Sequence, residues 1–235
     1  MERRVEPELL DTLPAADLRA ARSRRDLQRL NALMGHASIV ARCLGAAQSR
    51  PPRRVVDLGG GDGSFLLTVA GKLARHWPGV RVTLVDRHNL LSEPTRAGFQ
   101  QLGWQIELAQ ADAFEWMASS SLDSSECILA NLFLHHFASD RLRQLLSRVA
   151  ERTELFVACE PRRGRFVRAA SRLLWMIGCN AVTRHDAVAS VRAGFLAGEL
   201  SSLWPGDGHW RLSEESAGPF SHCFRASRLP GQAQS

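Results

Sequence analysis

From residue 54 onward, short apolar runs alternate with longer segments whose apolar residues recur at helical spacing. The runs expected to form strands are RVVDL (54–58), VRVTLVD (80–86), WQIELAQAD (104–112), DSSECILANLF (123–133) and ELFVACEP (154–161). Helical patterns fill most of the intervals between them. Strands that alternate with helices predict an α/β fold, in which a doubly wound, mostly parallel sheet is covered by helices on both faces.

The segments before, within and after this alternating region complete the expected architecture. Residues 1–50 carry Leu27, Leu30 and Met34 at helical spacing, and two prolines at 51–52 then predict a break. The chain ends on HWRLSEES and FSHCFRAS, which predict an antiparallel hairpin and bring the sheet to seven strands. We expect a helical cap over 1–50, one domain over 51–228 with a helical insertion at about 164–200, and a flexible tail over 229–235.

Composition favours an ordinary globular protein, with 45% hydrophobic and 23% charged residues. No apolar run is long enough to span a bilayer, and the N-terminal residues lack the apolar core of a signal peptide, so we expect a cytoplasmic protein. The five cysteines form no CxxC pair, which favours reduced thiols over a disulfide framework or a zinc site.

The positive charge is weak evidence for a nucleic-acid partner. The formal net charge is +6, but Lys72 is the only lysine among 30 basic residues. Such a strong preference for arginine more often reflects coding bias than a binding face. Since the arginines are also spread along the whole chain instead of forming one tract, nucleic acid is an unfavoured partner.

The sequence VVDLGGGDGSF (55–65) carries the clearest chemical signal. It follows a strand and opens a helix, which is the context of a nucleotide-binding turn. The Gly-Lys-Ser/Thr ending of a phosphate-binding P-loop is absent. The dinucleotide fingerprint GxGxxG fits imperfectly, because Ser64 stands at the position of its third glycine. The segment instead matches acid-x-G-x-G-x-G without a gap.

The acidic residues of this loop, Asp57 and Asp62, narrow the choice of cofactor. Their carboxylates would repel a pyrophosphate at the helix N-terminus, whereas a cofactor with a sulfonium and an ammonium group suits them. This favours S-adenosylmethionine (SAM) over NAD.

From 54 to 161 the sequence resembles the class I, Rossmann-like SAM-dependent methyltransferases, on the strength of VVDLGGGDGSF, TLVDRH and QADAFEW. The resemblance implies that Asp86 binds the ribose hydroxyls and that Asp112 binds the adenine amino group, with Ala113 or Phe114 against the ring. It also implies that Asn131 lies beside the methionine portion. The cofactor-binding residues expected are Asp57, Gly59, Gly60, Gly61, Gly63, Asp86, Arg87, Asp112, Ala113, Phe114 and Asn131.

His135 is the predicted catalytic residue. It follows the fourth strand in LFLHHF, and it takes the place of the histidine that serves as general base in some O-methyltransferases. Methyl transfer needs alignment of donor and acceptor, and removal of a proton where the acceptor is a hydroxyl. His136 is expected to face the other way. Because Asn131 and Glu160 alone do not make an acidic cluster, no metal is predicted.

Candidate acceptor contacts lie on the flanking helices and the strand edges. They are Met34, His136, Glu160, Trp175 and His185. The helix predicted after 164 presents an apolar face, with Phe166, Ala170, Leu173 and Ile177. This face would suit either the wall of a lid over the pocket or packing against the sheet.

The C-terminal segments also resemble bacterial methyltransferases associated with type III polyketide synthase operons. This implies a phenolic or pyrone acceptor methylated on oxygen or carbon. The alternatives are an RNA methyltransferase, an NAD(P)-linked oxidoreductase and a non-catalytic SAM-binding protein. The acceptor and the oligomeric state stay open, with a homodimer as one option.

Overall fold

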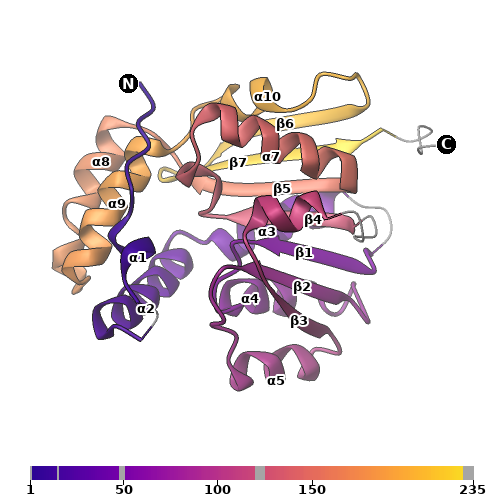
Figure 1. Ribbon diagram of the computed structural model, residues 1–235, viewed down its shortest axis with the longest axis horizontal. Coiled ribbons are helices and arrows are strands. Elements are labelled where there is room, and N and C mark those ends of the chain that lie inside the picture. The colour runs from indigo at the N-terminus through magenta and orange to yellow at the C-terminus, as the bar shows by residue number, and fades with distance from the viewer. Residues whose placement is uncertain (1, 15, 48–50, 120–124, 230–235) are drawn as a thin grey trace.

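The computed structural model of the chain describes residues 2–14, 16–47, 51–119 and 125–229. A seven-stranded sheet runs through it in the order β3-β2-β1-β4-β5-β7-β6 (Figure 1). The strands are β1 (Arg54–Leu58), β2 (Arg81–Asp86), β3 (Gln105–Gln110), β4 (Ser125–Asn131), β5 (Thr153–Pro161), β6 (Trp210–Ala217) and β7 (Ser221–Arg228). Strands β1 to β5 pair in parallel, whereas β7 is antiparallel to β5 and β6. The predicted fold class is confirmed, and the predicted tail lies outside the described residues from 230 onward.

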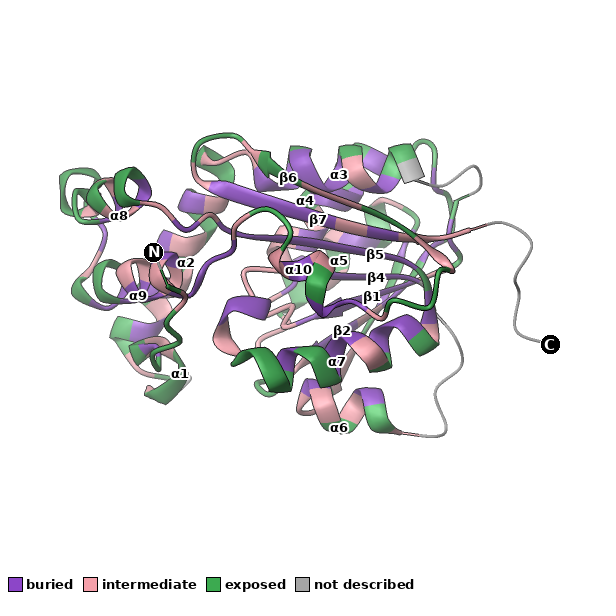
Figure 2. Cartoon of the chain, turned by 90° about the horizontal axis from the view of Figure 1, so that it is seen from above, coloured by how far each residue is buried: buried purple, intermediate pink, exposed green. Residues whose placement is uncertain are grey.

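Helices cover both faces of the sheet (Figure 2). One face packs against α3 (His36–Ala47), α4 (Ser64–Leu73) and α5 (Glu93–Gln101), and the other against α6 (Ala113–Ala118), α7 (Ser139–Arg152) and α10 (Glu199–Leu203). Val55 of β1 belongs to the first core and Val56 to the second, because successive side chains of a strand point to opposite faces. The parallel strands are therefore buried on both sides, as their continuous apolar runs predict.

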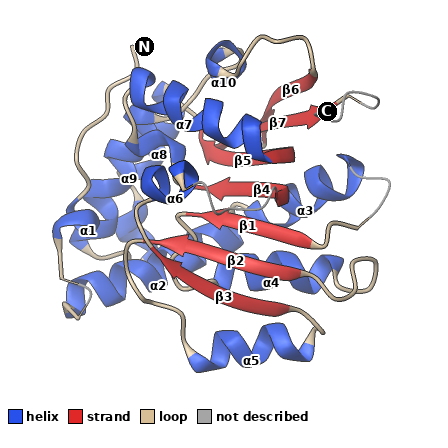
Figure 3. Ribbon diagram, turned by 45° about the vertical axis from the view of Figure 1, so that its right-hand side comes forward, coloured by secondary structure: helices blue, strands red, loops and turns tan. Residues whose placement is uncertain are grey.

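The remaining helices lie beyond the carboxyl ends of the parallel strands (Figure 3). They are α1 (Leu9–Thr12), α2 (Leu18–Leu33), α8 (Arg165–Ser171), the 3-10 turn η2 (Leu174–Ile177) and α9 (Ala181–Ala193). Gly35, with φ of 70°, separates α2 from α3. As a result α3 packs on the sheet instead of joining the cap that we expected over 1–50.

The first part of the insertion after β5 differs from the amphipathic helix expected to follow Gly164, whereas the second helix expected over 184–195 corresponds to α9. Helix α8 ends at Ser171, and the chain then tightens into η2. The predicted apolar face points outward, since Phe166 is 69% exposed and Ile177 53%. Of the four residues of the predicted face, Ala170 lines the cavity, next to Val167, which is buried. The periodicity misplaces most of the face because the helix is only two turns long.

The structure also bears on the expectations about the cysteines and about membrane-spanning segments. All five cysteines are free thiols, with four of them buried and Cys43 partly exposed. Within the described residues, no helix combines the length and the apolarity that a membrane crossing requires.

Glu214 on β6 makes the stability of the hairpin depend on pH. Its carboxylate accepts hydrogen bonds from His222 Nε2 at 2.8 Å and from the Leu200 and Ser201 N–H groups at 3.1 and 2.8 Å. Burial opposes the charged form, but the bonds from His222 and Ser201 outweigh it and lower the pKa of Glu214 to about 2. Such a carboxylate stabilises the fold above its ordinary pKa of 4.5, and the contribution is lost as the pH falls toward about 2.

We therefore expect Glu214→Gln to lower the melting temperature at neutral pH, with the gap to wild type closing between pH 4.5 and about 2. Glu107→Gln, an exposed carboxylate on β3, is the matched control and should show no such window. A gap for Glu214→Gln that stays constant through this acid range would contradict the assignment.

Candidate active site

A cavity of about 780 Å³ lies between the carboxyl edge of the sheet and the cap helices. The loops after β1, β2 and β3 line one side of it, together with η1 (Leu134–His136). The N-terminal segment, α2, α8 and α9 line the other side. The fold thus places the end of every strand in the parallel order β3-β2-β1-β4 next to one chamber, as expected for an open α/β sheet.

The glycine loop is held by Asp86, at the end of β2. Asp86 Oδ2 accepts a hydrogen bond from the Gly61 N–H at 3.0 Å, and Oδ1 accepts one from the His88 N–H at 2.8 Å. Gly59 and Gly61 have φ of 70° and 58°, a region that L side chains rarely adopt. The loop therefore turns tightly and leaves its backbone at the cavity wall.

Asp112 follows β3 and caps α6. Its Oδ1 accepts a hydrogen bond from the Phe114 N–H at 2.8 Å, which satisfies one of the free donors at the start of the helix. Its other oxygen keeps its acceptor capacity, and the residue lines the cavity.

The structure brings about half of the predicted site residues to the cavity wall. Those that line it are Gly59, Gly61, Asp86, Arg87, Asp112 and Ala113 on the cofactor side and Met34, His135 and His136 on the other. Those that do not are Asp57, Gly60, Gly63, Phe114, Asn131, Glu160, Trp175 and His185.

The charge argument from Asp57 and Asp62 needs a correction. Asp57 is buried beneath the loop, and burial together with the nearby Asp86 charge raises its pKa well above the usual range. Asp62 faces Gln28 and Ser64, to which it is hydrogen bonded. Neither carboxylate meets the cavity, so the acidic groups on its cofactor side are Asp86 and Asp112.

Gly59 should tolerate no side chain. A Cβ there would lie 2.2 Å from Phe133 Cδ2, and the positive φ would be strained in addition. We expect Gly59→Ala to cost roughly 1–3 kcal/mol of stability and to weaken binding of S-adenosylhomocysteine (SAH) in calorimetric titration. Gly71→Ala on α4 is the matched control, since its Cβ meets nothing within 4 Å, and it should be neutral or slightly stabilising.

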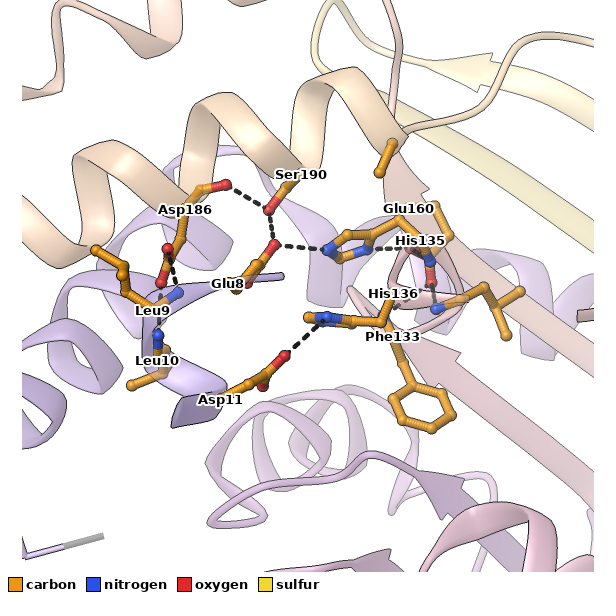
Figure 4. Close-up of polar contacts among 12 residues, drawn as sticks. Glu8, Leu9, Leu10, Asp11, Phe133, His135, His136, Glu160, Asp186 and Ser190 are labelled. Carbon is orange, nitrogen blue, oxygen red and sulfur yellow. Dashed lines mark hydrogen bonds and ion pairs between the residues drawn. The ribbon is translucent and has the colours of Figure 1, made fainter. Parts of the chain in front are cut away.

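His135 is held from one side by Glu160, at the end of β5. Its Nδ1 lies 2.7 Å from Glu160 Oε2, while Glu160 Oε1 accepts from the Phe133 and Leu134 N–H groups at 3.0 and 2.8 Å. Glu160 is fully buried, so it orients the 3-10 turn and its histidine instead of touching a ligand (Figure 4).

On the other side of the ring, His135 Nε2 lies 3.2 Å from Glu8 Oε1. Burial opposes the charged imidazolium, but the hydrogen bonds and charges of Glu160 and Glu8 outweigh it and raise the pKa of His135 to about 9. The same contacts, against the effect of burial, lower the pKa of both carboxyls. In this conformation both ring nitrogens are engaged, and the ring holds its proton at neutral pH.

His136 does not face away from the site as expected. Its Nδ1 lies 3.2 Å from Asp11 Oδ2, and its ring centroid lies 4.3 Å from that of His135. Both imidazoles line the cavity because His135 and His136 lie in a 3-10 turn, where consecutive side chains can point toward the same side. In a strand, consecutive side chains would point to opposite faces.

The other predicted contacts lie behind or outside the cavity. Asn131 Oδ1 lies 3.1 Å from His36 Nδ1, and burial lowers the pKa of His36 to about 4, which keeps that ring neutral. Trp175 is 59% exposed on η2. His185 lies half exposed on α9, with Nδ1 3.0 Å from Asp186 Oδ1.

Comparison with known proteins agrees with this geometry. Residues 55–154, from the glycine loop to the start of β5, match the family model described as a methyltransferase domain. This match covers less than half of the chain. No curated protein is detectably similar in sequence.

Solved structures share the fold of this chain at low sequence identity. An O-methyltransferase family protein from Burkholderia thailandensis has a TM-score of 0.60 at 19% identity, over 93% of this chain and 62% of the other. The mitomycin 7-O-methyltransferase MmcR has a TM-score of 0.58 at 19% identity, over 94% and 60%. The chain thus spans about 60% of the length of several of these proteins.

The plantazolicin methyltransferase BpumL, solved in complex with SAH, is closer in length. It has a TM-score of 0.64 at 12% identity, and the match covers 91% of this chain and 92% of BpumL. At such identities the likeness establishes the fold alone.

The N-terminal segment holds two cavity-lining acids that the sequence did not reveal, Glu8 and Asp11. Glu8 is buried and hydrogen bonds both His135 and the Ser190 hydroxyl on α9. Asp186 of α9 fixes the segment by accepting from the Leu9 and Leu10 N–H groups at 2.8 and 3.0 Å (Figure 4). No local motif marks these two acids, because their partners lie more than a hundred residues away in the chain.

Proposed function

We propose that this protein transfers a methyl group from SAM to a small, largely apolar acceptor. The observation that carries the proposal is one continuous cavity, which joins the glycine loop and Asp86 to a chamber that has His135 on one side and apolar side chains on the other. The methyltransferase domain match and the shared fold support SAM as the donor.

The cofactor is proposed to lie along the edge formed by β1, β2 and β3. Asp86 would accept from the two ribose hydroxyls, and Asp112 from the adenine amino group with Ala113 against the ring. Each carboxylate oxygen that already accepts a backbone N–H has a second lone pair for this purpose. Asp57 would act from beneath, by supporting the loop.

The acceptor is proposed to occupy the other half of the cavity. Leu27, Leu30, Met34, Val167 and Phe220 offer an apolar wall there, contributed by residues 1–50, by the insertion at about 164–200 and by the hairpin. This wall supports a flat, apolar acceptor such as a phenol or a pyrone of polyketide type, methylated on oxygen or carbon.

Catalysis is proposed to depend mainly on alignment, because nucleophilic displacement on a sulfonium carbon neutralises charge and needs little help beyond positioning. The role of His135 as a general base stays a prediction, and this conformation does not favour it. An acceptor hydroxyl could reach Nε2 only after Glu8 leaves that nitrogen and the ring loses its proton.

The test combines ligand-induced thermal stabilisation with product analysis. We expect SAH to raise the melting temperature and NAD to leave it unchanged, because NAD adds a pyrophosphate whose negative charge the carboxylates of Asp86 and Asp112 would repel. A search by mass spectrometry among phenols and pyrones should then find a product one methyl group heavier. Stabilisation by NAD alone would overturn the proposal, as would methylation of RNA with no small-molecule product.

The matched variant is His135→Ala. If His135 acts on the acceptor, turnover should fall while the affinity for SAH stays within a few-fold of wild type. An equal loss of both would indicate that His135 supports the cofactor site only.

A further inference from the structure

Glu8, His135 and His136 form a group of metal-ligating type at the cavity wall. Each offers one ligand atom, and these atoms all lie within 4.8 Å of one another. The two histidines come from η1 and the carboxylate from the N-terminal segment, and all three residues line the cavity (Figure 4). Two imidazoles and one carboxylate facing open space match the ligand sets of catalytic zinc and non-heme iron centres.

Both imidazoles are held by a second carboxylate on Nδ1. Glu160 Oε2 lies 2.7 Å from His135 Nδ1, and Asp11 Oδ2 lies 3.2 Å from His136 Nδ1. Metal-ligating histidines almost always have such an outer partner, which fixes the tautomer and makes the ligand more basic. Glu160 is itself locked by backbone N–H groups, so the orientation of His135 is set before any ligand binds.

The separation between His135 and Glu8 suits coordination to one ion. With metal–ligand bonds of about 2.1 Å, two ligand atoms 3.2 Å apart subtend an angle of about 100° at the metal. This angle falls between the tetrahedral and octahedral values. Glu8 Oε1 also accepts a hydrogen bond from the Ser190 hydroxyl, and it could keep this bond while binding a metal because a carboxylate oxygen has two lone pairs.

The local charge also favours a cation. The carboxylates of Glu8, Asp11 and Glu160 surround the two imidazoles, while Arg3 interacts with Glu160 and Arg87 with Asp11. Without bound protons the group therefore has an excess of negative charge, which a divalent ion would neutralise in a buried setting where unbalanced charge is costly.

We propose that Glu8, His135 Nε2 and a ring nitrogen of His136 bind a divalent transition metal ion of the zinc type. The mixed nitrogen and oxygen donors favour zinc, iron or cobalt over magnesium. Three protein ligands leave a position open toward the acceptor half of the cavity. Under the proposed methyl transfer, an acceptor hydroxyl bound there would release its proton more readily. His135 cannot act as a general base while it binds the metal, because both roles use the lone pair of Nε2.

The site differs from the sequence-based expectation, which was that no metal binds. That expectation rested on Asn131 and Glu160, and neither lines the cavity. The carboxylate that completes the group is supplied by a segment with no recognisable metal-binding spacing.

The test measures metal binding to the full-length protein without cofactor or acceptor, so its outcome does not depend on methyl transfer. We expect one equivalent of Zn²⁺ in calorimetric titration, visible absorption from bound Co²⁺, and no binding of Mg²⁺. Glu8→Gln and His136→Asn should each weaken Zn²⁺ binding by about 10–100-fold or more, since loss of even an outer partner has effects of that size.

The controls separate loss of a ligand from loss of the fold. His76→Asn changes an exposed histidine far from the cavity and should bind Zn²⁺ as wild type does. Zn²⁺ should raise the melting temperature of wild type and of His76→Asn but not that of Glu8→Gln. If Zn²⁺ binds wild type and Glu8→Gln equally, or binds neither, the group holds protons only and the proposal is wrong.

Discussion

Replacing Glu160 by alanine is expected to destabilise the protein by about 3–5 kcal/mol, which is the usual cost of removing one partner from a buried charge pair. The carboxylate is fully buried, and it accepts from His135 Nδ1 and from the Phe133 and Leu134 N–H groups. Its loss leaves a protonated imidazole and three backbone donors, the N–H groups of Phe133, Leu134 and His135, in the interior without their acceptor. Urea denaturation at neutral pH measures the effect.

Two further variants make the result specific. Glu107→Ala removes an exposed carboxylate that accepts only from the Thr83 hydroxyl among its described contacts, and it should change stability by less than about 0.5 kcal/mol. Glu8→Ala, which leaves the Glu160 pair intact, should fall between the two. A loss below about 1 kcal/mol for Glu160→Ala would mean that His135 gives up its proton and that the pair contributes little.

The second large effect is on cofactor affinity. Asp86→Ala removes the carboxylate that holds the Gly61 and His88 N–H groups and that we propose for the ribose hydroxyls. Hydrogen bonds to a charged group contribute about 1.5–3 kcal/mol each, so two of them correspond to a loss of at least roughly 100-fold in SAH affinity. Calorimetric titration with SAH measures it.

Asp140→Ala, an exposed carboxylate on α7, is the control for Asp86→Ala and should bind SAH as wild type does. The melting temperature of each variant without ligand reports whether the glycine loop is disturbed in the free protein. An affinity for SAH within three-fold of wild type, in a folded Asp86→Ala protein, would remove Asp86 from the cofactor site.

Local patterns in the sequence determined the parallel core and its cofactor edge. Apolar runs of four or five residues form strands buried on both faces, and the glycine spacing permits the positive φ values of the turn after β1. Asp86 and Asp112 reach the cavity because the carboxyl ends of parallel strands meet at one edge. Such features depend on neighbours in the chain, so the amino-acid sequence alone is enough to predict them.

Tertiary structure decided which face of a short helix is buried and which residues distant in sequence come into contact. The outward turn of Phe166 and Ile177 depends on where a two-turn helix ends, which periodicity cannot establish over so few residues. The ionisation of Asp57 and His135 depends on burial and on partners that lie far away in sequence. Glu8 reaches His135 only because α9 anchors the N-terminal segment over the cavity. The sequence therefore determined the fold and the cofactor edge, while long-range packing alone decided the charge and the contacts of the acceptor side.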